Sequence, residues 1–134
     1  MNKFEQFDYY DLLNLHKALM EAKFHDNPDN EDIAGSPIIA KIMNEIVDVL
    51  SDIDPHANNG DIQRWRKLAN HINFEKGIYS KTLVKVSKDK LWKNYTKEQK
   101  IKATKNYFSP FIATEEEIET FIQTIDSKLD WNNQ

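Results

Sequence analysis

The alternation of apolar and polar positions between Ser36 and Ile53 predicts a central apolar helix. Ser36 is a good N-cap, and Pro37 suits the first helical position because no N–H is needed there. Apolar residues fill about half of the helical wheel, which is wider than the roughly 100° stripe of a surface helix. They are Ile38, Ile39, Ile42, Met43, Ile46, Val47, Val49, Leu50 and Ile53. We expect such a helix to contact at least two neighbours, with the rest of the chain packed around it.

The same helical periodicity predicts further helices on both sides of this one. The first runs from Phe4 or Asp8 to Phe24, and the third runs from Asp61 to near Ile72. A short helix over 87–95 buries Leu91, Trp92 and Tyr95. Two more helices begin at capping boxes, where a threonine is followed three residues later by glutamine or glutamate. The boxes are Thr96 with Gln99 and Thr114 with Glu117, and Ser109-Pro110 ends the earlier of the two helices.

Residues 73–86 have the least decisive pattern in the chain. Their Ile, Tyr, Thr and Val content is typical of a strand, but no second strand is available to pair with one. We therefore expect an irregular or helical segment, with a short extended segment near 78–86 as the open alternative. A length of 134 residues suits one domain with one core. The predicted fold is all-α: a single bundle-like domain over 1–134, with five or six helices around the central one.

Several classes of chemistry lack the residues that they need. The chain has no cysteine, which excludes disulfides, thiolate zinc sites and cysteine nucleophiles. Its three glycines stand singly at 35, 60 and 77, so no glycine-rich phosphate loop is present. No signal peptide and no apolar run of about 18 residues is visible. These features predict a non-catalytic, cytoplasmic protein with no cofactor, no metal and no membrane contact.

Two fragments resemble metal sites of helical enzymes. The His25-Asp26 pair, with His16 before it and Asp48, Asp52 or Asp54 after it, resembles the ligand set of HD-type metal phosphohydrolases, in which imidazoles and carboxylates converge on a metal. Glu45-x-x-Asp48 resembles half of the magnesium site of helical nucleotide pyrophosphohydrolases. A metal-dependent phosphohydrolase is therefore the third functional alternative. The competing interpretation is that His16 is partly buried and hydrogen-bonded to backbone or to a neighbouring carboxylate, and that the carboxylates of Glu45-x-x-Asp48 are solvated.

Charge is distributed in three blocks of alternating sign. Residues 1–60 hold 4 Lys and 12 Asp or Glu, a net −8. Residues 61–107 hold 13 Lys or Arg and 4 Asp or Glu, a net +9, and residues 108–134 hold 1 Lys and 6 Asp or Glu, a net −5. Segregated charge steers and orients encounters between proteins. The pattern predicts a protein that binds an acidic partner protein, as small inhibitors, immunity proteins and phage accessory factors do.

The basic block also permits a nucleic-acid-binding function over 64–105. Lysines neutralise phosphates, and the interleaved aromatic residues Tyr79, Trp92, Tyr95 and Tyr107 are of the type that stacks on bases. Against this stand a pI of about 5.5 and the scarcity of arginine. A further possibility is that the basic helices are paired with the acidic ones within the molecule. The residues expected to contact a partner are Arg64, Lys67, His71, Lys88, Lys93, Lys97 and Lys100.

Overall fold

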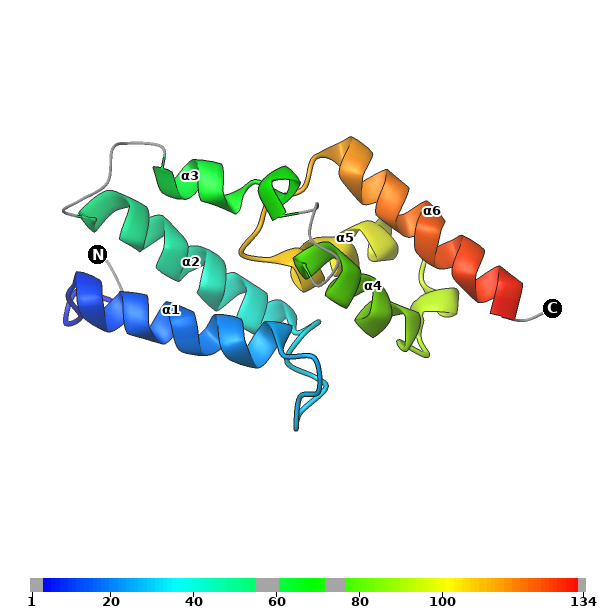
Figure 1. Ribbon diagram of the computed structural model, residues 1–134, viewed down its shortest axis with the longest axis horizontal. Helices are drawn as coiled ribbons and strands as arrows, with labels where there is room; N and C mark the ends of the chain where they lie inside the picture. The colour runs from blue at the N-terminus through cyan, green and yellow to red at the C-terminus, as the bar shows by residue number, and fades with distance from the viewer. Residues whose placement is uncertain (1–3, 55–60, 72–76, 133–134) are drawn as a thin grey trace.

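The computed structural model describes residues 4–54, 61–71 and 77–132 (Figure 1). These ranges contain six α-helices, two short 3₁₀ helices and no strand, which confirms the all-α prediction. The elements are α1 (Tyr9–Phe24), α2 (Pro37–Ile53), α3 (Asp61–Arg66), η1 (Leu68–His71), α4 (Ile78–Ser87), η2 (Trp92–Asn94), α5 (Lys97–Phe108) and α6 (Glu115–Asn132).

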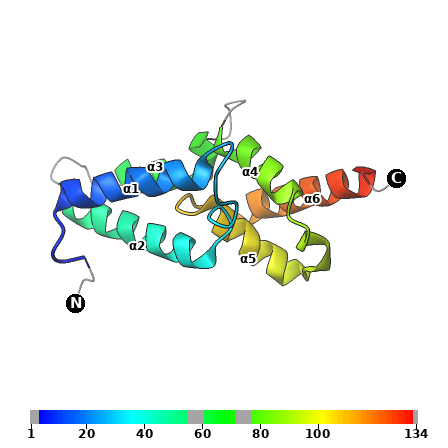
Figure 2. The same cartoon turned by 90° about the horizontal axis from the view of Figure 1, so that it is seen from below.

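The helices form two groups along the length of the molecule. In Figures 1 and 2, α1 and α2 lie antiparallel at one end, while α4, α5 and α6 pack together at the other end. Helix α2 contacts α1, α3 and α5, which confirms that its wide apolar face meets at least two neighbours. Helix α2 thus connects the two groups.

The observed apolar face of α2 is narrower than the predicted one. Its N-cap is as expected, because the Ser36 hydroxyl accepts a hydrogen bond of 3.2 Å from the Ile39 N–H. The buried positions are Ala40, Met43, Ile46, Val47 and Leu50. However, the predicted core residues Ile38 and Ile53 are 70% and 41% exposed, so the neighbouring helices cover the middle of α2 and leave its ends in water.

The larger hydrophobic core lies among α4, α5 and α6. Trp92, Phe108, Phe121 and Ile125 are almost completely buried there, and the Phe108 and Phe121 rings pack edge to face at 4.9 Å. A smaller core between α1 and α2 is formed by Leu12, Ile46 and Leu50. The predicted central helix therefore borders the largest apolar cluster without forming it.

Both predicted capping boxes are present. The Gln99 N–H donates to Thr96 Oγ1 at 3.1 Å, and the Thr96 N–H donates to Gln99 Oε1 at 2.8 Å. The same exchange joins Thr114 and Glu117 at the start of α6. Helix α5 ends at Phe108, directly before Ser109-Pro110, as expected. These helix ends are correctly predicted because each depends on contacts within one turn.

Two predicted elements differ in the structure. The segment near 78–86 is the helix α4, so the extended alternative is wrong; Thr82 and Val86, one turn apart, are its buried residues. The third helix ends at Arg66 and does not continue to near Ile72, a residue outside the described part. At that point the Ile112 N–H donates to the Arg66 carbonyl at 2.6 Å, and Lys67 and Ile112 form a parallel β-bridge. The contact with Ile112 takes the place of the hydrogen bonds that would have continued the helix beyond Arg66.

Candidate interaction surface

The seven residues expected to contact a partner lie in three separate places. Three belong to α3 and the segment after it. Arg64 forms an exposed ion pair with Asp61, and Lys67 is exposed. His71 is half-buried: its Nε2 lies 2.6 Å from the Trp65 carbonyl, and its ring lies 4.4 Å from the Phe111 ring. The imidazole is therefore occupied by structural contacts.

Lys97 and Lys100 on α5 face the acidic last helix. Lys97 pairs with Glu119 at 3.1 Å, and Lys100 pairs with Asp126 at 2.9 Å. Asp126 also accepts a hydrogen bond of 2.8 Å from the buried Trp92 indole. For these two lysines, the acidic and basic blocks meet within one molecule, so their charge is partly neutralised.

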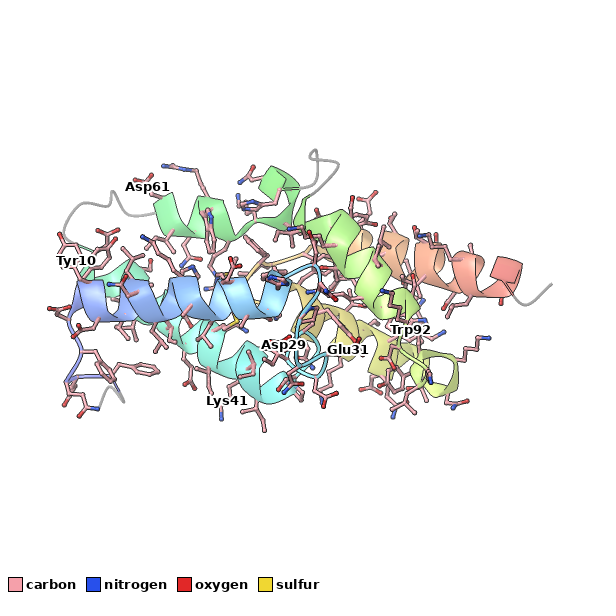
Figure 3. All side chains as sticks on the ribbon, turned by 60° about the horizontal axis from the view of Figure 1, so that its bottom comes forward. Tyr10, Asp29, Glu31, Lys41, Asp61 and Trp92 are labelled. Atoms are coloured by element: carbon pink, nitrogen blue, oxygen red, sulfur yellow. The ribbon has the colours of Figure 1, made fainter. Side chains whose placement is uncertain are left out.

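The remaining two residues, Lys88 and Lys93, lie in the connection between α4 and α5. We call residues 88–95 the basic corner; Figure 3 labels Trp92 in it. Lys88, Lys90 and Lys93 are exposed there. Within the described ranges, none of the three forms an ion pair. Their positive charge is directed to solvent.

Leu91, in the middle of the basic corner, is 60% exposed, so the prediction that it is buried is wrong. The cause is the tight turn that precedes η2. Asp89 Oδ1 accepts the Leu91 N–H at 2.9 Å, and the Asp89 carbonyl accepts the Trp92 N–H at 3.2 Å. This turn directs Trp92 into the core and leaves Leu91 on the surface.

The basic corner borders a groove of about 1170 Å³. One side is the loop over 26–37, and the other is formed by α4 and α5, so we call it the α4–α5 groove. The lining residues of each helix recur at helical spacing, which means that each helix presents one face. These faces comprise Ser80, Lys81, Val84 and Lys85 on α4, with Lys88 directly after it, and Gln99, Lys102, Ala103, Asn106 and Tyr107 on α5.

The two sides of the groove carry opposite charge. The loop contributes Asp26, Glu31 and Asp32, whereas the helical side contributes Lys81, Lys85, Lys88, Lys90 and Lys102 beside one carboxylate, Asp89. Figure 3 labels Glu31 on the loop. Lys81 pairs with Asp26 at 3.5 Å, and the Lys85 ammonium donates to the Lys23 carbonyl at 2.7 Å. Among the described residues that line the groove, Lys88, Lys90 and Lys102 therefore remain without such partners.

Tyr107 lies against the loop and contributes a polar group to the groove. A Cβ at Gly35 would come within 2.8 Å of the Tyr107 ring, so a glycine allows this close approach. Burial raises the pKa of Tyr107 to about 12, with smaller contributions from Asp89, Tyr95 and Asp32. The phenol therefore stays protonated near neutral pH. Its hydroxyl has no hydrogen-bond partner among the residues that the structure describes, so it can donate to a ligand.

Lys23, which the sequence analysis did not single out, closes the C-terminal end of α5. Its side chain is completely buried, and Nζ donates to the carbonyls of Asn106 and Ser109, both at 2.5 Å. Carbonyls at a helix C-terminus lack intrahelical donors and favour a cation. Burial, and to a smaller extent Lys85, lowers the Lys23 pKa to about 7. The contact fixes α1 against α5 and thereby positions the helical side of the groove.

Arg66, like Lys23, is a buried basic residue whose structural role is not evident from the sequence. Its Nε donates to the Pro110 carbonyl at 3.0 Å, Nη1 pairs with Asp48 at 2.6 Å, and Nη2 donates to Asn44 Oδ1 at 3.0 Å. Asn44 and Asp48 lie on the predicted polar face of α2. That face is therefore partly used to bind an internal arginine.

The residues of the phosphohydrolase alternative do not form a metal centre. His16, His25 and Asp26 line one pocket of about 420 Å³, but no group of three or more histidines or carboxylates in the described ranges could hold a metal ion. Asp26 pairs with Lys81, and Asp48 pairs with Arg66. His25 Nδ1 accepts the Asn27 N–H at 3.0 Å.

His16 is buried as expected, but its predicted hydrogen bonding is wrong at one ring nitrogen. Nδ1 is enclosed and has no hydrogen-bond partner within the described structure. The ring instead packs edge to face on Trp65, with centroids 5.3 Å apart. Burial lowers the His16 pKa, and Lys17 adds to the effect. The neutral imidazole is thus the form that suits this position.

Comparisons of the chain with protein-family models, with curated proteins and with solved structures found no match. None of the described helices combines the length and the apolar character that a membrane crossing requires. A functional assignment must therefore rest on the surface itself.

Proposed function

We propose that this chain is a small, non-catalytic cytoplasmic protein that acts by binding an acidic partner protein, in the manner of inhibitors, immunity proteins or phage accessory factors. The basic corner is the proposed contact. The observation that carries this proposal is the exposure of Leu91, at 60%, among three lysines that form no ion pair with any described residue.

Leu91 is an exposed aliphatic residue with lysines on both sides of it in the sequence. This arrangement combines two properties of protein-binding surfaces. The aliphatic side chain gains free energy when a partner removes it from water, and such anchors dominate many interfaces. The surrounding lysines contribute little energy individually, but they speed and orient the approach of a negatively charged surface. An acidic protein with an apolar recess is the partner that fits both.

Nucleic acid, the alternative ligand, would use the same lysines against phosphates. It would also need exposed aromatic rings for stacking. Trp92 is fully buried, and Tyr79 stacks on Phe108 inside the core at 5.9 Å. Tyr95 and Tyr107 are partly buried and also pack against that core, so all four interleaved aromatic residues are engaged in packing. The described surface therefore supports a protein partner better.

The test compares two triple variants with equal change in charge. Lys88→Glu, Lys90→Glu and Lys93→Glu reverse the basic corner, whereas Lys17→Glu, Lys41→Glu and Lys128→Glu reverse three exposed lysines elsewhere. Each purified protein is immobilised and incubated with a lysate of the cells that produce it, and bound proteins are quantified by mass spectrometry. We expect a stoichiometric acidic partner that the corner variant loses and the control variant retains.

The proposal fails if no stoichiometric protein is recovered or if both triple variants retain the same partner. A parallel DNA column separates the alternative ligand. Retention that weakens steeply between about 50 and 200 mM salt, and that only the corner variant loses, would assign nucleic acid to this surface.

A further inference from the structure

We infer, building on the proposed function, that the α4–α5 groove receives a segment of the partner polypeptide that carries carboxylates along one edge and aliphatic side chains beside them. One side of the groove is basic and the other is acidic, so the groove determines which edge of the segment faces α4 and α5. The partner is thereby recognised by its pattern of charge and not by its net charge alone.

The size of the groove favours a polypeptide over a small molecule. Its volume of about 1170 Å³ exceeds the roughly 300–1000 Å³ of typical small-molecule pockets. Its helical side consists of two helix faces, and peptide segments commonly lie in grooves of this kind. A chain segment could therefore follow α4 and α5 and end at the basic corner.

The apolar surface in the groove has no partner in the isolated protein. Val84 and Leu91, both groove residues, are 50% and 60% exposed. Exposed aliphatic residues are ordinary when single, but here two border one concave surface. Aliphatic side chains of the partner that cover Val84 and Leu91 would remove apolar surface of both molecules from water.

Charge sets the orientation of the bound segment. Lys88, Lys90 and Lys102 can pair with carboxylates of the segment without breaking an ion pair that the structure describes. On the opposite side, Glu31 and Asp32 would repel carboxylates, so the acidic edge must face the helices. Glu31 and Asp32 would also repel a polyanion that is negative along both edges, so such a ligand should bind the groove less tightly.

Polar groups in the groove can bind the backbone of the segment. The Tyr107 hydroxyl remains a donor near neutral pH and is free of described partners. Gln99 and Asn106 line the same side of the groove. Hydrogen bonds to main-chain carbonyls do not depend on sequence, so they would add affinity while the lysines and aliphatic residues supply selectivity.

The experiment uses three short fluorescent peptides of equal length as probes, with binding to the full chain followed by fluorescence anisotropy. The first places glutamates on one helical edge and leucines beside them. The second replaces the leucines by glutamine, and the third replaces the glutamates by lysine. We expect the first to bind at least about tenfold more tightly than either of the others, because one buried leucine alone can change affinity by that factor. Equal binding of the first two, or tighter binding of the third, would overturn the inference.

Variants then locate the bound peptide. Val84→Asp should weaken binding of the first peptide by about tenfold or more, whereas Ile112→Asp, at a 52% exposed position that does not line the groove, should leave it unchanged. Both substitutions are at exposed side chains, and circular dichroism checks that both variants fold. Unchanged binding to Val84→Asp would place the peptide elsewhere and refute the groove as its site.

The same variants separate this inference from the proposed function. If the recovered partner protein is lost on reversal of the basic corner but still binds Val84→Asp, the proposed function stands and the groove is not the contact. Self-association of the purified protein in sedimentation, abolished by Val84→Asp, would make a second copy of this chain the occupant and would overturn the inference of a separate partner.

Discussion

The two ends of the molecule are stabilised in different ways. Among the residues that the structure describes, the assembly of α4, α5 and α6 surrounds a core of ten buried apolar residues, half of them aromatic, to which α1 and η1 also contribute. The pair of α1 and α2 shares a core of three buried residues, Leu12, Ile46 and Leu50. The pair nevertheless contains the helix with the widest predicted apolar face. The wide apolar face of α2 therefore correctly indicates that this helix is packed between neighbours. It does not indicate that the largest core lies elsewhere, among α4, α5 and α6.

Two buried basic side chains link the helix pair to the rest of the molecule. Lys23 joins α1 to the end of α5, and Arg66 joins α2 to the segment around Pro110. Removing one partner from a buried charged network costs far more than removing an exposed one. The helix pair should therefore depend on the larger core for its stability, and the predictions below test that dependence.

The largest effect is expected for Ile46→Asp. Ile46 is completely buried between α1 and α2, and an uncompensated carboxylate there costs several kcal/mol, against a total stability of about 5–15 kcal/mol. We expect the whole chain to unfold, in circular dichroism and in loss of the Trp92 indole NMR signal. Ile53→Asp, at a 41% exposed position of the same helix, is the control. A variant that loses the helix pair but keeps the Trp92 signal would show that the two ends are independent.

The next effect is expected for Arg66→Ala, which leaves Asp48 and the Pro110 carbonyl without their donor. Because the Asp48 side chain is 63% exposed and is hydrated again in the variant, the loss comes mainly from the Pro110 carbonyl. It should be about 1.5–3 kcal/mol in the free energy of unfolding, measured in urea. Arg64→Ala is the matched control, because Arg64 is 66% exposed and its ion pair should contribute less than about 1 kcal/mol. Similar losses for the two arginines would contradict the role given to Arg66.

A pH-dependent effect is expected for Lys23→Met. The variant leaves the Asn106 and Ser109 carbonyls without a donor, which should cost about 1–3 kcal/mol. Because the Lys23 pKa falls from 10.5 to about 7 on folding, the unfolded chain binds more protons between these values. The wild type should therefore gain stability as pH rises from about 7 to 10, a gain that the variant lacks. Urea titrations should show the difference between the two proteins widening over this range; a narrowing would contradict the burial of the ammonium.

The smallest effect is expected for His16→Phe, which keeps an aromatic ring against Trp65. The folded pKa of His16 lies below its ordinary value of 6.5, so the unfolded chain binds more protons just below that pH. The wild type should lose stability as pH falls below 6.5, and the loss should level off below the folded pKa. The variant should lose less over the same window in thermal melts. If the wild type and the variant lose the same stability as pH falls, then His16 Nδ1 has a hydrogen-bond partner in solution that offsets its burial.

The parts of the fold that were predicted correctly depend on local rules. Ser36, Thr96 and Thr114 begin α2, α5 and α6 because each contact that caps the helix lies within one turn of sequence. Helix α4 was harder to predict, since Thr82, Val84 and Val86 are weak helix formers. Its helical state follows from the burial of Thr82 and from the packing of Val86 in the larger core with distant residues, which no local pattern contains.

The candidate surface was predicted only in part, for a related reason. Lys88 and Lys93 were expected to be available for a partner, and they are exposed. Lys97 and Lys100 belong to the same basic segment of the sequence. However, they face carboxylates of α6 that are more than twenty residues away along the chain. The predicted short helix over 87–95 would bury Leu91 beside Trp92, but the turn at Asp89 leaves it on the surface. Contacts with the distant helix α6 decided the placement of the two lysines, whereas a local turn decided that of Leu91.

The bonds from Lys23 to Asn106 and Ser109 span 83 and 86 positions of the chain. On the ribosome, α1 and α2 emerge well before the carbonyls that this lysine must meet, so its ammonium stays hydrated while the later helices are being synthesised. Dehydration of that one charge is consequently delayed in biogenesis until the residues around Ser109 have been synthesised.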